Sequence, residues 1–406
     1  MGQPQKDPVR LKALYSLLKA DQRYAEGAEK LLQAAMAEHK PEQLQEETAV
    51  RLYKDVLSGS VTRIEQFEGC PFSHFLRYGL QLKKREEFDI EAMDIGNLYH
   101  RSLDLVFRMA ASGHREIGEI DDASLMKICD EAVALTTRDY HDRIMESSAR
   151  SRYIAGRVQK ITRRTVWALK QQLLQGGFRT LGTEMPFRYR EAQLDLHGVI
   201  DRVDCCETED RVLVKVIDYK SGSTRFDIKL VRNGLQLQLV TYMDMALQLA
   251  GSRYPERSKV EPAGMFYYHI SDPVIDYKLL NTVEDTEHKR LDALRLEGAV
   301  SEDAAAVLHM DKTLPLAPGS VITAKELRGS AVIQSAGACL LSGEGFEELM
   351  QSTRERMQED ADRILHGEIR VQPYRSGSKT RCDYCEYHSV CGFGDQLPGF
   401  SYRKII

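Results

Sequence analysis

The chain has 406 residues, of which 42% are hydrophobic and 29% charged, and a formal net charge of −5. This balance is typical of a globular protein with more than one core-forming unit, and it excludes a globally basic nucleic-acid-binding protein. No apolar run approaches the roughly 20 residues of a membrane helix, and no signal peptide opens the chain. We therefore expect a cytoplasmic protein that does not interact with membranes.

The pattern of the sequence predicts five segments along the chain. These are a helical appendage or tail of a preceding domain (1–57), a helical region (58–177), a core of strands and a helix (178–300), an insertion followed by a long helix (301–370), and a cysteine-rich end (371–406). The insertion includes a stretch at 300–335 that we expect to be irregular.

The clearest change of pattern begins near Phe178, where apolar residues change from helical spacing to alternation. The alternation predicts three successive strands, FRTLGTEMPFRYR, QLDLHGVIDRVDCC and RVLVKVIDYKSG, which are joined by polar turns. A helix (LQLQLVTYMDMALQLA) and an apolar strand (AGMFYYHI) follow. A long helix from Phe346 to Leu365 should stop at Gly367. The sequence therefore predicts an α/β fold.

Two carboxylates and a lysine gather in the strand region. Asp218 and Lys220 are two residues apart at the end of a buried strand, so their side chains leave the same face of the sheet. A hairpin can bring Asp201, from the preceding strand, beside Asp218. Such a set suits Mg²⁺-assisted phosphodiester hydrolysis, because hard cations prefer carboxylate oxygens and lysine stabilises negative charge. A single D-x-K is more often ordinary surface charge, but the apolar run before it argues against an exposed hairpin.

Three further polar residues are weaker candidates for the same site. Gln238 and Tyr242 are four residues apart on one helix face. Core packing alone would explain Tyr242, whereas Gln238 needs a polar partner. His100 lies on an apolar helix, where a lone histidine is usually structural, and spacing alone cannot place it near Asp201.

A basic stretch offers a candidate contact with single-stranded DNA. Its cations recur at three- and four-residue spacing, as on one helix face, at Arg157, Lys160, Arg163 and Arg164. Phosphate contacts would make the affinity depend on salt. The alternative is a solvated helix face.

Four cysteines lie at the two ends of this region. Cys382, Cys385 and Cys391 form a C-x2-C-x5-C cluster, and Cys70 lies far upstream in an aromatic-rich segment. Three thiolates define most of a metal or cluster site, and a four-thiolate site needs one more ligand, which Cys70 could supply. Zinc and an iron–sulfur cluster both remain open. The other cysteines are expected to be free thiols, since the absence of a secretory context argues against a disulfide framework: Cys129, Cys205, Cys206 and Cys339.

Six motifs then carry a resemblance to a known family. SVTRIEQFEGCPFSHFLRYGL, IGNLYHRSLD, GVIDRVD, VIDYKSG, QLQLVTY and CDYCEYHSVC occur in the order of the RecB-like PD-(D/E)XK nucleases. The version with one upstream and three C-terminal cysteines resembles the C-terminal nuclease domain of the AddB family, found in bacterial helicase–nucleases. The resemblance covers residues 58–406. It implies a mixed central sheet flanked by helices, with an iron–sulfur staple joining the two ends.

The resemblance also implies roles for the matching residues. Mg²⁺ or Mn²⁺ would be bound by His100, Asp201, Asp218 and the backbone carbonyl of Tyr219. Lys220 would be the catalytic lysine, with Gln238 and Tyr242 beside it, and Glu184 matches an acidic position. A [4Fe–4S] cluster would be held by Cys70, Cys382, Cys385 and Cys391.

The implied function is exonucleolytic cleavage of single-stranded DNA during double-strand break processing for homologous recombination. The strand expected to be cut is the 5′-terminated one, and an AddA-like helicase–nuclease subunit is the expected partner. The chain lacks the large helicase-like region of that family and any Walker A motif, so we expect a fragment or a truncated relative. Two alternatives are a stand-alone exonuclease of the CRISPR-associated type and a non-catalytic scaffold that binds DNA ends.

Overall fold

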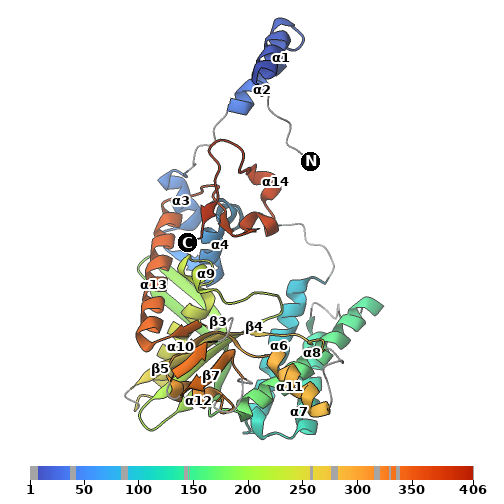
Figure 1. The fold of residues 1–406 in the computed structure, drawn as a ribbon, viewed down its shortest axis with the longest axis vertical. Coiled ribbons are helices and arrows are strands. Elements are labelled where there is room, and N and C mark those ends of the chain that lie inside the picture. The colour runs from blue at the N-terminus through green and yellow to red at the C-terminus, as the bar shows by residue number, and fades with distance from the viewer. Residues whose placement is uncertain are drawn as a thin grey trace.

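The computed structural model of the chain describes residues 8–36, 43–83, 90–140, 145, 147–256, 259–275, 282–314, 321–328, 331–334 and 339–405. Within these ranges, a mixed seven-stranded sheet lies between two layers of helices (Figure 1). The predicted α/β fold with a mixed central sheet and flanking helices is thus confirmed.

The sheet has the order β1-β3-β4-β5-β6-β9, and β2 pairs with β3 outside this path. Its strands are β1 (Leu57–Gly59), β2 (Arg179–Glu191), β3 (Leu194–Glu207), β4 (Val212–Lys220), β5 (Val260–His269), β6 (Glu297–Ser301) and β9 (Cys339–Leu341). The chain runs antiparallel through β2, β3 and β4 and then crosses over a helix to β5, which pairs parallel with β4. Such a crossover is the usual way to join parallel neighbours.

The helices fall into groups by position. The appendage and the segment that leads to Cys70 and beyond contain α1 (Pro8–Ala20), α2 (Ala25–Met36), α3 (Glu46–Tyr53), α4 (Val61–Gly69) and α5 (Pro71–His74). One face of the sheet carries α6 (Ala92–Ser112), α7 (Asp122–Arg138) and α8 (Ala149–Leu174). The remaining helices are α9 (Ile228–Arg232), α10 (Gln238–Arg253), α11 (Val283–Ala293), α12 (Ala304–Met310), α13 (Gly343–Leu365) and α14 (His388–Cys391).

Strand β4 explains why the sheet is covered on both faces. Val212, Val214 and Val216 pack into the core formed with α10 and α13, whereas Leu213 and Ile217 pack into the core formed with α6, α7 and α8. Alternation with apolar residues on both sides is the pattern of a fully buried central strand. Asp218 and Lys220 continue the first set, so their side chains point toward the α10 layer.

The predicted elements of the core agree with the structure to within a few residues. The predicted strands correspond to β2, β3, β4 and β5, and the predicted helix after β4 corresponds to α10. Helix α13 ends before Gly367, whose positive φ of 81° suits a glycine after a helix.

The expectation of an irregular stretch at 300–335 was wrong for the residues that the structure describes. This stretch contains α12 and an antiparallel hairpin of β7 (Ala324–Arg328) and β8 (Ala331–Gln334). Val307 of α12 is fully buried in the core. The elements are too short for periodicity to identify them. Residues 315–320 and 329–330, as well as 335, lie outside the described ranges.

The two ends of the nuclease-like region meet at α4 (Figure 1). A small sheet of β10 (Tyr374–Ser376), β11 (Lys379–Thr380) and β12 (Arg403–Lys404) frames the C-terminal segment. Arg403 donates to the backbone oxygen of Glu68 at 2.6 Å, and the amide of Phe72 donates to the carbonyl of Arg370 at 3.1 Å. The structure thus joins segments that lie near opposite ends of the sequence.

A buried ion triad lies on the face of β3 and β4 that points toward α6. Arg202 makes two hydrogen bonds of 2.7 Å to Asp204, and Lys215 lies 3.1 Å from the same carboxylate. All three side chains are buried, and Arg202 also stacks over Phe107 of α6. Because the charges are desolvated, each depends on its partners.

Removal of Asp204 is therefore expected to leave two unpaired buried cations. We predict that Asp204→Ala lowers the free energy of unfolding by about 3–5 kcal/mol. Arg188→Ala breaks an exposed ion pair with Asp195 and should cost less than about 1 kcal/mol. Urea unfolding followed by circular dichroism measures both. A loss of similar size in the two variants would contradict the importance of the buried triad.

Candidate active site

The β3–β4 hairpin places two carboxylates side by side. Arg202 pairs with Ile217 across the ladder, and Asp201 and Asp218 are the residues next to this pair. Both are buried, with 8% and 1% of their surface exposed. The backbone amide of Tyr219 donates to Oδ2 of Asp201 at 2.7 Å. The sequence predicted this juxtaposition.

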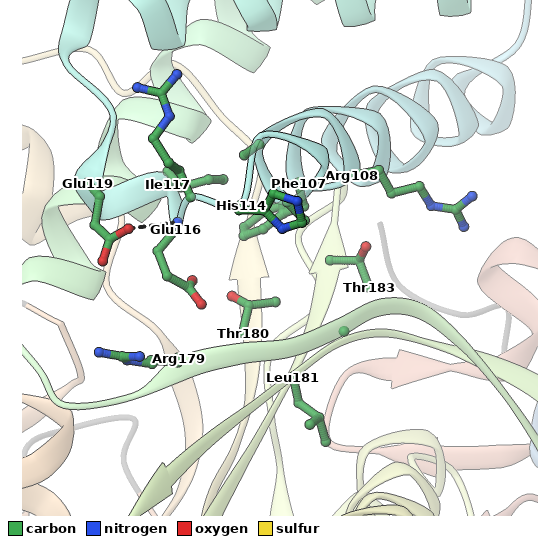
Figure 2. Close-up of a pocket in the computed structure, with 14 residues that line it drawn as sticks. Phe107, Arg108, His114, Glu116, Ile117, Glu119, Arg179, Thr180, Leu181 and Thr183 are labelled. Atoms are coloured by element: carbon green, nitrogen blue, oxygen red, sulfur yellow. Dashed lines mark hydrogen bonds between the residues drawn. The ribbon is translucent and has the colours of Figure 1, made fainter. Parts of the chain in front are cut away.

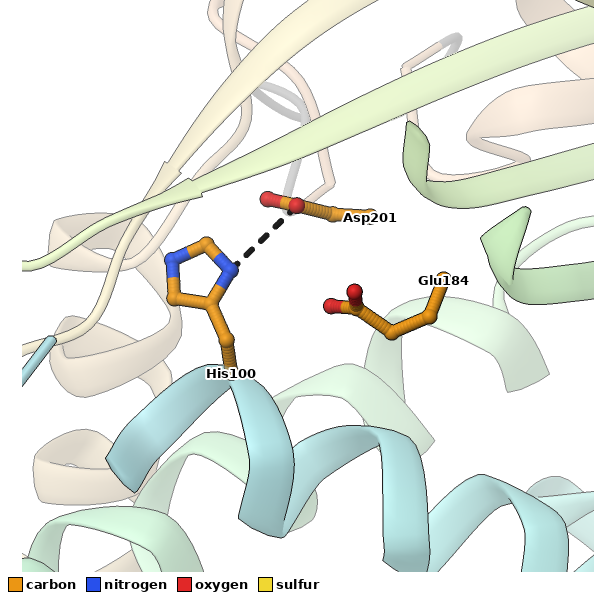
Figure 3. A group of neighbouring side chains, drawn as sticks. All are labelled: His100, Glu184 and Asp201. Atoms are coloured by element: carbon orange, nitrogen blue, oxygen red, sulfur yellow. Dashed lines mark ion pairs between the residues drawn. The ribbon is translucent and has the colours of Figure 1, made fainter. Parts of the chain in front are cut away.

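His100 and Glu184 bring two further ligand atoms to the same place (Figure 3). Nδ1 of His100, on α6, lies 3.2 Å from Oδ1 of Asp201. The coordinating atoms of His100, Glu184 and Asp201 all lie within 4.8 Å of one another, and in the described part of the chain they form the one such group. Carboxylate oxygens with one imidazole suit a divalent cation such as Mg²⁺ or Mn²⁺.

Glu184 reaches this position through an unusual backbone. It lies in β2 opposite Asp201, between the pairs Thr183–Arg202 and Met185–Ile200, and its φ is +45°. A non-glycine residue rarely adopts this left-handed conformation, and such residues are concentrated at functional sites. The local strain turns the carboxylate toward Asp201, which sequence alternation alone does not predict.

Lys220 connects Asp218 to the helix that follows. Its Nζ lies 2.6 Å from Oδ2 of Asp218 and 2.9 Å from Oε1 of Gln238. Gln238 donates its amide to the hydroxyl of Tyr242 at 2.7 Å. Among the described residues, Oδ2 of Asp218 has no hydrogen bond of good geometry despite the short ion-pair distance. A buried carboxylate oxygen of this kind fits a cation ligand.

The site carries more negative charge than its own cations neutralise. Burial and the neighbouring Asp201 raise the pKa of Asp218 to about 7, although Lys220 opposes them. Burial and Asp201 also raise the pKa of Glu184 to about 7. Burial lowers the pKa of His100, but Asp201 and the other carboxylates raise it above its usual value. A bound divalent cation would relieve this crowding of carboxylates.

These side chains line a cavity of about 580 Å³. Its wall includes His100, Asp201, Asp218, Lys220 and Gln238, with Tyr219 between them, so the structure brings together all but Tyr242 of the predicted hydrolytic set around one space. Tyr242 lies behind Gln238. The cavity also contains residues that the sequence did not single out, among them Asn97, Arg101 and Tyr140.

A second cavity, of about 530 Å³, lies beyond the site along α6 and β2 (Figure 2). Its charged residues are of both signs, with Arg108 and Arg179 near Glu116 and Glu119. Within the described ranges, no group of metal-ligating side chains converges there. The first cavity is therefore the candidate for metal-dependent chemistry.

Comparison with known proteins identifies the family. Residues 58–392 match the family described as the PD-(D/E)XK nuclease superfamily. The chain belongs to the PD-(D/E)XK nuclease superfamily. The resemblance found in its motifs is thereby confirmed.

Its relatives within the PD-(D/E)XK nuclease superfamily carry a common name, that of a subunit of an ATP-dependent helicase/deoxyribonuclease. The chain is 35% identical over 383 residues to the protein of that name from Lachnoclostridium phytofermentans, covering 93% of the chain and 33% of that protein. It is 31% identical over 378 residues to the one from Alkaliphilus oremlandii, covering 89% and 32%. For Listeria innocua the values are 28% over 397 residues, 95% and 34%. The chain spans about a third of the length of the curated relatives it matches.

The four predicted cluster cysteines also meet in this PD-(D/E)XK nuclease domain. Cys70, Cys382, Cys385 and Cys391 line one small cavity beside α4. Burial raises the pKa of Cys382 to about 11, and the other three thiols add to this effect. Among the described residues, no three of the four sulfur atoms form a group within 4.8 Å. A single tetrahedral zinc ion would hold its thiolates about 3.8 Å apart.

The basic stretch on α8 does not form a free positive surface. Lys160 lies 2.8 Å from Asp272, Arg164 lies 3.7 Å from the same carboxylate, and Arg163 pairs with Asp130. The predicted DNA contact there is therefore not supported, because acidic neighbours already neutralise most of the cations. None of the helices within the described ranges is long and apolar enough to cross a membrane.

The raised pKa values predict how cation binding depends on pH. A carboxyl group must lose its proton to bind a metal, and Asp218 and Glu184 have pKa values raised to about 7. The affinity for Mn²⁺ should therefore fall as the pH drops, by roughly tenfold or more between about pH 8 and pH 6. Glu184→Gln should weaken binding and flatten this dependence.

Isothermal titration calorimetry of the domain with Mn²⁺ measures the affinity at each pH. His197→Ala is a suitable control, since His197 is exposed on the same strand as Asp201 and should leave binding unchanged. An affinity that does not vary with pH would show that these carboxylates do not hold the cation.

Proposed function

We propose that this chain is a metal-dependent deoxyribonuclease domain that hydrolyses phosphodiester bonds. The observation that supports this most strongly is the convergence of His100, Glu184, Asp201 and Asp218 with Lys220 around one cavity. The names of its relatives, each part of a deoxyribonuclease, support DNA as the substrate.

The proposed roles follow from where each side chain lies. His100, Asp201, Asp218 and the carbonyl of Tyr219 would hold Mg²⁺ or Mn²⁺, with Glu184 as a further oxygen ligand. The cation, when bound, would lower the pKa of an attacking water and polarise the scissile phosphate. Lys220 would stabilise the developing negative charge. Gln238 fixes the ammonium group of Lys220, and Tyr242 fixes Gln238 in turn.

We further propose that the substrate is single-stranded DNA, cut from the 5′-terminated strand at double-strand ends. The domain would act as part of a helicase–nuclease complex with an AddA-like subunit, in the processing of breaks for homologous recombination. The support is the helicase/deoxyribonuclease name of the relatives and the span of about a third of their length.

The four cysteines are proposed to bind a [4Fe–4S] cluster with a structural role. Their common cavity supports one shared centre. Sulfur atoms spaced too widely for a group of three favour a cluster over a single zinc ion. The centre would tie α4 to the C-terminal segment.

Cleavage of end-labelled single-stranded DNA in the presence of Mg²⁺ tests the proposed activity. Asp218→Asn and Lys220→Ala should each lower the rate at least about a hundredfold, because each removes a group that acts on the metal or on the transition state. Asp195→Asn changes a carboxylate on β3 away from the cavity and should cleave normally. Substrates labelled at the 5′ or the 3′ end report the polarity. Near-normal cleavage by Asp218→Asn at saturating Mg²⁺ would refute the assignment.

Iron and sulfide analysis of purified variants tests the cluster. Cys70→Ala should lose iron as completely as Cys382→Ala and should become sensitive to proteases, since ligand loss removes folding free energy. Cys205→Ala should keep its iron, because this buried thiol lies outside the cysteine cavity. If Cys70→Ala retains a full complement of iron and sulfide, the fourth ligand is another residue.

A further inference from the structure

Helix α10 begins without a cap from its own sequence. The residue before its first turn is Leu237, which has no side chain able to accept a hydrogen bond. The first amides of a helix have no partner within the helix, so they need an acceptor from elsewhere. Oε1 of Glu65, on α4, accepts from the amide of Leu237 at 2.7 Å and from the amide of Gln238 at 3.1 Å. A distant helix therefore supplies the missing cap.

The capped residue is also the one that contacts Lys220. Gln238 is the first residue of α10, and its side chain bonds both to Nζ of Lys220 and to the hydroxyl of Tyr242. Helix ends fray most easily, since their hydrogen bonds are fewest. The anchor thus acts where disorder would move the amide away from Lys220.

Helix α4 can serve as a firm base for this anchor. Glu68 pairs with Arg363 of α13 at 2.9 Å and with Arg403 of β12 at 2.9 Å. Gln66 accepts from Arg381 at 2.5 Å. The apolar side of the helix, with Ile64 and Phe67, is fully buried. Since α4 is tied on several sides, Glu65 is presented to α10 in a fixed position.

We propose that Glu65 is a positioning residue, which anchors the first turn of α10 and thereby orients the amide of Gln238 toward Lys220. This inference rests on the nuclease function proposed above. Burial raises the pKa of Glu65, while the two amides and Lys220 act in the opposite direction. A neutral glutamine, which keeps an acceptor oxygen of the same reach, should therefore replace it well.

A double-mutant cycle on cleavage of single-stranded DNA tests the proposal. Glu65→Ala should lower kcat roughly ten- to hundredfold, through misplacement of Gln238, with little change in KM or in the Mg²⁺ requirement. Glu65→Gln should stay within about threefold of the wild type. The double variant Glu65→Ala/Gln238→Ala should be no slower than Gln238→Ala alone, to within about twofold. Losses that multiply would overturn the proposal, since they would show independent effects.

A matched control removes a similar cap elsewhere. Asp121 caps α7 by accepting from the amide of Ser124 at 2.9 Å, and Asp121→Ala should leave kcat unchanged. If Asp121→Ala slows cleavage as much as Glu65→Ala does, the effect is one of general stability and the proposal fails. If Glu65→Ala does not fold, Glu65→Met takes its place in the cycle, because it fills the space without an acceptor oxygen.

Amide hydrogen exchange supplies a readout that does not depend on cleavage. The amides of Leu237 and Gln238 should exchange at least about tenfold faster in Glu65→Ala than in the wild type or in Asp121→Ala. Unchanged exchange at these amides would overturn the anchor. A wild-type domain that cleaves no DNA with any divalent cation would refute the proposed function instead, and the exchange rates would still decide whether Glu65 holds α10.

Discussion

Two buried carboxylates on neighbouring antiparallel strands are the constraint on which the rest of the structure depends. Charges of the same sign at this distance, removed from water, are unfavourable unless other groups compensate them. The compensating groups come from three elements: the amide of Tyr219 and the ammonium group of Lys220 on β4, His100 on α6, and Gln238 on α10. The positions of both helix layers are thus tied to Asp201 and Asp218. The remaining excess of negative charge is what makes the site fit a divalent cation.

Helix α4 joins this site to the cysteine cavity. The helix ends at Cys70, which lines the cavity with the three C-terminal cysteines, and it carries Glu65 against the start of α10. A centre that binds those thiols would hold the two ends of the domain together and so restrict the unfolded chain. The path from the cysteines to Lys220 is short, since it passes through one helix and the first residue of another. Loss of the cysteine centre is therefore expected to affect the nuclease site as well as the overall stability.

Local patterns in the sequence predicted the parts of the fold whose signals are local. Strands β2, β3 and β4 alternate over many residues and end at polar turns, and α13 ends at a glycine. Asp201 and Asp218 followed because a hairpin joins their strands. His100 could be assigned only through the family resemblance, since its helix is brought to the sheet by tertiary packing. Glu65 had no signal as a cap, because its partners lie 172 and 173 residues away, and the strained backbone of Glu184 cannot be read from alternation.

The charges of α8 show why a basic pattern is a weak guide to a DNA surface in an acidic protein. Asp130 and Asp272 neutralise Lys160, Arg163 and Arg164, so little attraction for phosphate remains on that face. The active-site cavity starts from the opposite condition. Glu184, Asp201 and Asp218 outnumber the permanently charged Lys220 and Arg101 that line it with them, so these side chains by themselves repel a phosphodiester. A divalent cation reverses that local charge. Productive binding of a phosphodiester at this site thus depends on the cation that also activates the reaction, which couples recognition to catalysis.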